Sequence, residues 1–322
     1  MERVLDPSVL PQRRETGLSL GVAFVVMVIL LVAGPFVVYP VFLMKALCFA
    51  LFACAFNLLI GYVGLISFGH AMFFGWASYV AAYAAKSWGW PPEFAIIVAT
   101  AAATVLGLIA GGLAIRRQGI YFAMITLALA QMMYFYALQA KFTGGEDGIQ
   151  GVPRGRLFGI FDLSSELTMY GFVLIVVLAG FLLIYRIIHS PFGEVLKAIR
   201  ENEQRAISLG YMSERCKLVA FVLSATLAGL AGSLNALVFQ LASLTDVHWT
   251  MSGDVVLMTL LGGLGTVFGP VVGAFVVIAM QNYLAPFGQW VLVIQGAIFV
   301  LCVLLFRRGI VGELAHALRV RL

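Results

Sequence analysis

Charge is scarce in this sequence. Only 11% of its 322 residues are Asp, Glu, Lys or Arg, whereas 62% are hydrophobic. An ordinary water-soluble domain carries about a quarter of its residues as charged side chains, so this composition excludes that class. The chain also lacks a Gly-x-x-x-x-Gly-Lys-Ser/Thr phosphate loop, because the glycine-rich stretch 262–265 has no lysine and lies among apolar residues. We therefore expect no ATP site on this chain.

The residues that usually perform chemistry are few and scattered. The four histidines are His70, His189, His248 and His316, and the four cysteines are Cys48, Cys54, Cys216 and Cys302. Neither group has metal-ligand spacing or forms a catalytic constellation, so we expect no enzyme activity, no cofactor and no metal site. Acidic residues are almost absent from the apolar runs, whereas ion-coupled carriers usually hold their ion with such groups. An ion-coupled carrier or channel that works alone remains the alternative to a driven transporter.

Long apolar runs are what the chain has instead, and its mean hydropathy is +1.02. A hydrocarbon core about 30 Å thick requires a helix of about 20 apolar residues, because a helix satisfies its backbone polar groups internally. The sequence therefore predicts an all-α, polytopic transmembrane bundle with about ten membrane segments. These are residues 18–38, 41–60, 70–85, 94–115, 120–140, 167–188, 218–241, 255–261, 271–283 and 290–306. The two short segments between 255 and 283 either cross the membrane or form a re-entrant pair.

Basic residues are distributed unequally between the predicted loops. If both termini are cytoplasmic, fifteen of the twenty Lys and Arg residues lie on the cytoplasmic side, as the positive-inside rule requires. The predicted organisation is a cytoplasmic segment 1–17, a membrane domain 18–306 and a cytoplasmic tail 307–322. Lys45 and Asp254 then lie near the outer ends of their segments.

One predicted cytoplasmic loop, residues 189–217, is unusually polar. Nine of the charged side chains lie between Glu194 and Lys217. The apolar residues of this loop follow helical spacing, which predicts one short amphipathic helix that begins at Pro191 and ends at Gly210. Its mixed charge favours a groove on another protein over an anionic lipid surface, and a solvated connector is the alternative. The residues assigned to it are Phe192, Glu194, Val195, Leu196, Ile199, Arg200, Glu203, Ala206 and Gly210.

Several stretches resemble those of one transporter family. They are GYVGLISFGHAMFFGWASYVAAY from Gly61, RRQGIYFAMITLALAQM from Arg116, TGGEDGIQGVP from Thr143, the loop 189–210, and GGLGTVFGPVVGA from Gly262. Together they look like the permease subunits of branched-chain amino acid ABC importers, and are most similar to the longer, M-type paralogue. The resemblance implies a subunit of the bacterial inner membrane that forms half of a translocation pathway and hydrolyses nothing itself.

The resemblance also implies partners. The loop would be the coupling helix, which inserts into a cleft on a cytoplasmic ATP-binding subunit, and ATP would be bound there. The general pattern E-A-A-x-x-x-G is matched only in part, because Ala206 and Gly210 keep their spacing but Glu203 stands one residue early. The other implied partners are a paralogous permease, a periplasmic solute-binding protein and the lipid membrane, and no nucleic acid is expected.

Polar residues within the apolar segments are the candidates for the substrate pathway. Such groups usually face the interior of a bundle, although many only bond neighbouring helices. The candidates are Asn57, Ser67, His70, Thr126, Gln131, Asn235, Gln281 and Asn282. For His70, at the predicted inner end of its segment, we favour donation to a backbone carbonyl across a helix break over a role as gate or substrate sensor.

The predicted outer loop 141–166 is rich in glycine and mixed in charge. Its spacing does not match an EF-hand, which leaves a solvated connector or a docking surface for the binding protein, and the resemblance favours docking. Substrate selection would then reside in the binding protein. The expected cargo is a branched-chain or related hydrophobic amino acid, with urea, short amides or small carboxylates as alternatives.

Overall fold

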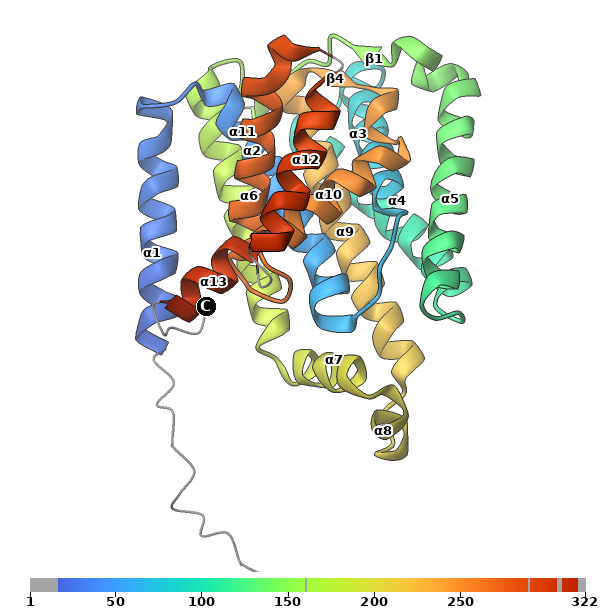
Figure 1. The fold of residues 1–322 in the computed structure, drawn as a ribbon. Helices are drawn as coiled ribbons and strands as arrows, with labels where there is room; N and C mark the ends of the chain where they lie inside the picture. The colour runs from blue at the N-terminus through green and yellow to red at the C-terminus, as the bar shows by residue number, and fades with distance from the viewer. Residues whose placement is uncertain (1–16, 160, 289, 306–308, 318–322) are drawn as a thin grey trace, which may run out of the picture.

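The computed structural model describes residues 17–159, 161–288, 290–305 and 309–317, most of which are helical (Figure 1). The α-helices are α1 (Gly17–Ala33), α2 (Pro40–Asn57), α3 (His70–Lys86), α4 (Pro92–Ala114), α5 (Ile120–Gln139), α6 (Glu166–Ile188), α7 (Pro191–Glu201), α8 (Glu203–Ser208), α9 (Ser213–Phe239), α10 (Trp249–Gly262), α11 (Gly269–Leu284), α12 (Trp290–Leu305) and α13 (Gly309–Ala317). Apart from Gly17, the predicted segment 1–17 lies outside the described residues, as do 307–308 and 318–322 of the predicted tail.

Short elements occupy the connections. The π-helix η3 (Leu58–Val63) continues α2, and the 3-10 turns are η2 (Gly34–Phe36), η4 (Lys141–Thr143), η5 (Gly145–Asp147), η6 (Leu244–Asp246) and η7 (Ala285–Phe287). The strands are β1 (Ile149–Gln150), β2 (Arg156–Leu157), β3 (Phe161–Asp162) and β4 (Leu241–Ala242). β1 pairs antiparallel with β4, and β2 pairs antiparallel with β3.

Within the part of the chain that the structure describes, five helices are long and apolar enough to cross a membrane, judged by length and composition. They are Pro40–Val63, Pro92–Ala114, Ile120–Gln139, Glu166–Ile188 and Ser213–Phe239. Large apolar side chains such as Leu30, Ile175 and Leu304 point outward and are exposed, which suits contact with lipid tails. The prediction of an all-α polytopic membrane bundle is confirmed.

Helix α2 is the centre of the bundle. The apolar window of Pro40–Val63 is entirely buried, and α6, α9, α10 and α11 pack around it. A helix that is apolar on every side is stable only when it is covered on every side. Two of the four cysteines, Cys48 and Cys54, are free and buried in this helix, in agreement with the packing role that small apolar residues predict.

Small residues allow α9 to approach α3 and α4 closely. A Cβ added to Gly229 would come within 2.2 Å of the Ala103 Cβ, and one added to Gly232 would come within 2.0 Å of the Phe74 carbonyl oxygen. The Ser78 hydroxyl donates a hydrogen bond of 2.7 Å to the Gly232 carbonyl across this contact. Such small-residue contacts replace the hydrophobic driving force that is missing between helices in lipid.

Helices α10 and α11 form a short antiparallel hairpin. They contain 14 and 16 residues, or about 21 and 24 Å, less than the hydrocarbon thickness of about 30 Å. Gly273 packs against the Met258 carbonyl, and Gly262 packs against that of Gly269. These lengths favour the re-entrant reading of the segments between 255 and 283.

Helix α13, within the segment predicted as a tail, packs on α10 and α11.

The bundle has two distinct ends, seen at the bottom and top of Figure 1. Helices α7 and α8 lie at the first, called the α7 end below. The strand pair β1–β4 lies at the second, called the β1 end. The connection 64–69 rises from the α7 end before α3 begins, so that α3 starts within the bundle and not at its surface (Figure 1).

Candidate functional site

The predicted amphipathic helix at 191–210 is two helices. α7 ends at Glu201, where Asn202 adopts an extended backbone and its side-chain oxygen accepts a hydrogen bond from the Arg205 N–H. Asn202 is therefore the N-cap of α8, a role that asparagine performs well. Ser190 caps α7 in the same way. The prediction of one continuous helix is wrong because a residue that caps the second helix also ends the first.

The apolar face of α7 packs against this chain's own bundle. Leu196 and Ile199 are buried, and Phe192 and Val195 are half-buried, with α6, α9 and η3 as neighbours. This face was expected to enter a groove on another protein, and it is unavailable for that purpose in the described structure. On its outer side, Glu194 and Lys197 form an exposed ion pair of 2.8 Å, which contributes little to stability.

Arg200 connects α7 to the core. Its guanidinium donates a hydrogen bond to the Gly61 carbonyl of η3. In η3 the neighbouring Tyr62 hydroxyl donates to the Gly265 carbonyl at 2.9 Å. Gly265 lies in the turn between α10 and α11, so these bonds join three parts of the chain. π-helical turns occur frequently at functional sites.

Asn57 completes this connection. Its amide nitrogen donates to the Thr266 carbonyl at 2.9 Å, and its oxygen accepts from the Gly265 N–H at 3.1 Å. Asn57 was predicted as a pathway residue. Its described bonds instead hold the α10–α11 turn against the end of α2.

Glu203 anchors α8. One of its carboxylate oxygens forms an ion pair of 2.5 Å with Lys217 of α9, and the other accepts from the Gln118 amide at 2.8 Å. The Lys217 side chain is only 6% exposed, so water screens this pair less than a surface pair. Glu203 stands one residue before the acid position of the E-A-A-x-x-x-G pattern. Its bonds fit a role in holding α8 to the bundle.

The end of α8 and the residues after it expose apolar side chains. Ile207, Leu209, Tyr211 and Met212 are 47%, 71%, 45% and 61% exposed, and these four residues are called the 207–212 surface below. Ala206 is buried beneath them, and Gly210 ends the helix with a left-handed φ of 89°. Leu209 is exposed, unlike Leu196 and Ile199 of α7, because Asn202 ends α7 and begins a separate helix.

His70 is held in the middle of the bundle. Its Nε2 atom lies 2.8 Å from the Ser224 Oγ atom, which in turn donates to the Ala55 carbonyl at 2.5 Å. A hydroxyl has one hydrogen, so Nε2 is the donor in the first contact. The expected bond to a backbone carbonyl across a helix break is thus relayed through Ser224. Because α3 begins inside the bundle, His70 lies deep and not at the predicted inner end.

Two other predicted pathway residues stabilise the start of α3. Thr126 Oγ1 accepts a hydrogen bond from the Phe68 N–H at 3.2 Å, and Ser67 Oγ accepts from the Gly69 N–H at 3.2 Å. Both side chains are fully buried. Gln131 is half-buried on α5, and Asn282 is exposed on α11, so the structure does not bring these two together with the others.

Asn235 and Gln281 do meet, at a cavity near the β1 end. The cavity has a volume of about 220 Å³, and its lining residues are Lys45, Phe49, Asn235, Phe239, Leu241, Ser243, Thr245, Asp246, Met251, Asp254 and Gln281. Sequence reasoning did not include Lys45, Asp246 or Asp254 among the site residues. Lys45 carried a usable signal, because it lies within the predicted segment 41–60 and charged residues inside membrane segments are rare and usually functional.

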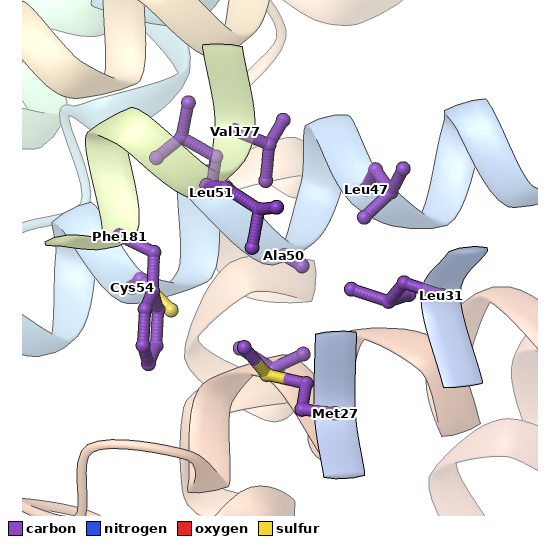
Figure 2. Close-up of a pocket in the computed structure, with 10 residues that line it drawn as sticks. Met27, Leu31, Leu47, Ala50, Leu51, Cys54, Val177 and Phe181 are labelled. Carbon is purple, nitrogen blue, oxygen red and sulfur yellow. The ribbon is translucent and has the colours of Figure 1, made fainter. Parts of the chain in front are cut away.

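A second pocket, between α1, α2 and α6, differs in size and chemistry (Figure 2). Its volume is about 10 Å³, about enough for a single water molecule. Its lining is apolar and includes Met27, Leu51 and Phe181, which face one another in Figure 2. Such a crevice lacks the polar groups that would orient a solute.

The loop 141–166 is fixed to the β1 end by several bonds. Lys86 Nζ donates to the Gln150 carbonyl at 2.7 Å, and the Arg154 guanidinium donates to the Val238 carbonyl at 2.8 Å. Gly148 has a φ of 66°, and a Cβ there would lie 2.2 Å from the Ala242 carbonyl oxygen. Within the described ranges no group of three His, Cys, Asp or Glu residues could hold a metal ion.

Comparisons with known proteins agree on one family. Residues 38–303 match the family described as branched-chain amino acid transport system / permease component. The high-affinity branched-chain amino acid transport system permease protein LivM of Escherichia coli (strain K12) is 26% identical over 277 residues, which cover 79% of this chain and 65% of LivM. The chain thus spans less than two thirds of the length of that relative. No solved structure matches.

More distant relatives include other importers. The probable LivM permease of Methanocaldococcus jannaschii is 29% identical over 189 residues, covering 55% of this chain and 53% of the relative. The ribose import permease protein RbsC of Bacillus subtilis (strain 168) is 29% identical over 189 residues, which cover 56% of this chain and 58% of RbsC. The match to the family extends over most of the chain and agrees with the helical bundle described above. This multi-pass membrane protein belongs to the family of permease components of branched-chain amino acid transport systems.

Proposed function

We propose that this chain is a permease subunit of an ATP-driven importer of branched-chain or related hydrophobic amino acids. It pairs with a second, related permease, and a solute-binding protein delivers substrate to it. ATP is bound and hydrolysed by separate ATP-binding subunits. Family membership and the names of the LivM relatives support this assignment. The absence of a phosphate loop from the sequence agrees with it.

The observation that carries the proposal is the 207–212 surface. Four apolar side chains are exposed at the end of the bundle where fifteen basic residues are predicted to gather. An exposed apolar patch with a polar rim is typical of a protein interface. The α7 end then faces the cytoplasm of a bacterial inner membrane, and the occupant of the surface is the ATP-binding subunit.

The bonds of Arg200 supply the path for the coupled motion. An ATP-binding subunit that moves α8 also moves α7, because the two helices are contiguous. Arg200 transmits that displacement to η3, and Asn57 and Tyr62 transmit it to the α10–α11 turn. Packed, hydrogen-bonded elements of this kind carry coupling between distant sites.

Reconstituted transport tests the proposal. The chain, its paired permease and the ATP-binding subunits are reconstituted in proteoliposomes oriented for import. ATP is enclosed in the lumen, and the binding protein and the substrate are added outside. We expect uptake of leucine, isoleucine and valine that requires ATP, with much slower uptake of ribose, urea and acetamide. Leucine uptake by the chain alone, without ATP-binding subunits, would refute the assignment and favour a carrier or channel.

A further inference from the structure

The cavity at the β1 end brings together polar residues from five elements. Lys45 lies on α2, Asn235 on α9, Asp246 on η6, Asp254 on α10 and Gln281 on α11. Its volume of about 220 Å³ is far above the 10–15 Å³ or so that one water molecule requires. These elements include the central helix and both helices of the short hairpin. The cavity therefore lies where motion of the α10–α11 turn would change its shape.

The charges in this cavity are close to one another but are not paired. Lys45, Asp246 and Asp254 all line the cavity. Among the described residues, however, no ion pair within 4.0 Å joins Lys45 to either carboxylate. Direct pairing would offset part of the cost of removing these charges from water. A cation and two carboxylates held apart instead leave room for a ligand that carries both charges.

Asn235 supplies a second and independent sign of a ligand. Its side chain lines the cavity and is 5% exposed, and its Oδ1 atom has no hydrogen-bond partner among the described residues. A buried acceptor without a donor costs about 1–3 kcal/mol. The ammonium group of a ligand would satisfy this oxygen.

The two carboxylates accept hydrogen bonds from one side chain and one backbone N–H. The Gln281 amide donates to Asp254 Oδ2 at 3.2 Å, and the Ser243 N–H donates to Asp246 Oδ2 at 3.4 Å. Burial raises the pKa of Asp246 to about 6, while the Ser243 hydrogen bonds and the Lys45 charge act in the opposite direction. The hydrogen bonds from Gln281 and Ser243 thus fix both carboxylates at the wall of the cavity.

The remaining lining is mostly apolar. Phe49, Phe239, Leu241 and Met251 provide aromatic and aliphatic surface beside the charged groups. Small-ligand sites commonly combine such a wall with a few polar groups that fix orientation. We propose that this cavity is a subsite for a zwitterionic, aliphatic amino acid, whose carboxylate faces Lys45 and whose ammonium faces Asp246, Asp254 and the Asn235 oxygen. This proposal rests on the proposed function and adds the residues that contact the substrate.

Protection from chemical labelling tests the subsite without requiring transport. Thr245, an exposed residue of the lining, is changed to cysteine after Cys216 and Cys302 are replaced by serine. The assembled importer is then treated with a maleimide. We expect L-leucine to slow labelling, whereas L-leucinamide, which lacks the carboxylate, and 4-methylpentanoate, which lacks the ammonium, have little effect. Equal protection by all three compounds, or by none, would overturn the subsite.

A second experiment tests the subsite by substituting its charged residues. We expect Lys45→Met and Asp254→Asn each to remove protection by leucine and to lower ATP-driven leucine uptake about thirtyfold or more, as expected when one partner of a desolvated charge pair is lost. Arg117→Met also removes one positive charge, at an exposed position on the α4–α5 connection outside the cavity, and should keep both properties. Full uptake and protection in both cavity variants would overturn the subsite while leaving the proposed function intact. Wild-type protein that binds leucine here but never imports it with ATP would contradict the proposed function alone.

Discussion

In the proposed mechanism, Arg200 is the residue on which transmission between the two ends most depends. Its guanidinium holds the Gly61 carbonyl, and Tyr62 beside it holds the α10–α11 turn. Lysine carries the same charge but lacks the planar fork of donors, so it cannot reproduce the arginine geometry. Removing the side chain would leave a buried carbonyl without a donor at a cost of about 1–3 kcal/mol.

We therefore expect Arg200→Ala to lower leucine transported per ATP hydrolysed by about tenfold, the equivalent of about 1.4 kcal/mol. In Arg200→Lys, the amount of leucine transported per ATP hydrolysed should lie between those of the wild type and Arg200→Ala. Uptake and phosphate release are measured on the same proteoliposomes, with Arg117→Ala as the control, because Arg117 is exposed on the α4–α5 connection. An unchanged ratio of leucine to ATP in Arg200→Ala would remove this residue from the path.

At the scale of elements, the α7–α8 segment depends on two local features that a helical pattern does not specify. Asn202 caps α8 and separates it from α7. Gly210 ends α8 with a φ of 89°, and no atom lies within 4 Å of where its Cβ would be. A substitution at Gly210 thus acts on backbone conformation alone, because no neighbour would be displaced.

Replacing Gly210 with valine should disturb the 207–212 surface, because a left-handed conformation costs a residue with a Cβ about 1–2 kcal/mol. Gly210→Asn should be tolerated better, since asparagine adopts that conformation more readily. We expect leucine uptake to fall clearly in Gly210→Val and little in Gly210→Asn, while thermal unfolding of the detergent-purified protein is unchanged. Gly112→Ala, on an exposed part of α4, is the control. Equal uptake in the valine and asparagine variants would contradict this account.

Helix positions could be predicted from the sequence because hydropathy and length determine which segments suit a membrane. The predicted segment 120–140 corresponds to α5 (Ile120–Gln139), and 167–188 corresponds to α6 (Glu166–Ile188). The breaks were not predictable in the same way. The end of α7 follows from a capping bond of Asn202, and the deep start of α3 depends on Thr126, 58 positions away from Phe68.

Of the two candidate sites, the one formed by a local segment could be predicted from the sequence, and the one formed by distant residues could not. The α7–α8 segment was identified because its charge contrasts with an apolar chain, but which of its faces is exposed depended on the break. The cavity was missed because its residues come from six elements separated in sequence by up to 236 positions, from Lys45 to Gln281. Local periodicity carries no information about such contacts, and only Lys45, charged and within a predicted membrane segment, gave a direct hint.

In the whole molecule, the two sites lie at opposite ends and are connected through α2 and the α10–α11 hairpin. The α7 end carries the exposed 207–212 surface, and the β1 end carries the charged cavity. Asn57 at the end of α2 and Tyr62 in η3 hold the hairpin turn, while Lys45 of α2 lines the cavity together with Asp254 of the hairpin. Motion of the hairpin relative to α2 would therefore affect both sites at once.

The central claim is that motion enters this bundle from an ATP-binding subunit seated on the 207–212 surface. A photo-crosslinking amino acid placed at Leu209 of the active, assembled importer tests it most directly, with the same group at lipid-facing Ile175, which is 68% exposed on α6, as the control. Position 209 should crosslink to the ATP-binding subunit, and position 175 should not. If position 209 crosslinks only to lipid or remains unreacted while the importer is active, the claim is wrong.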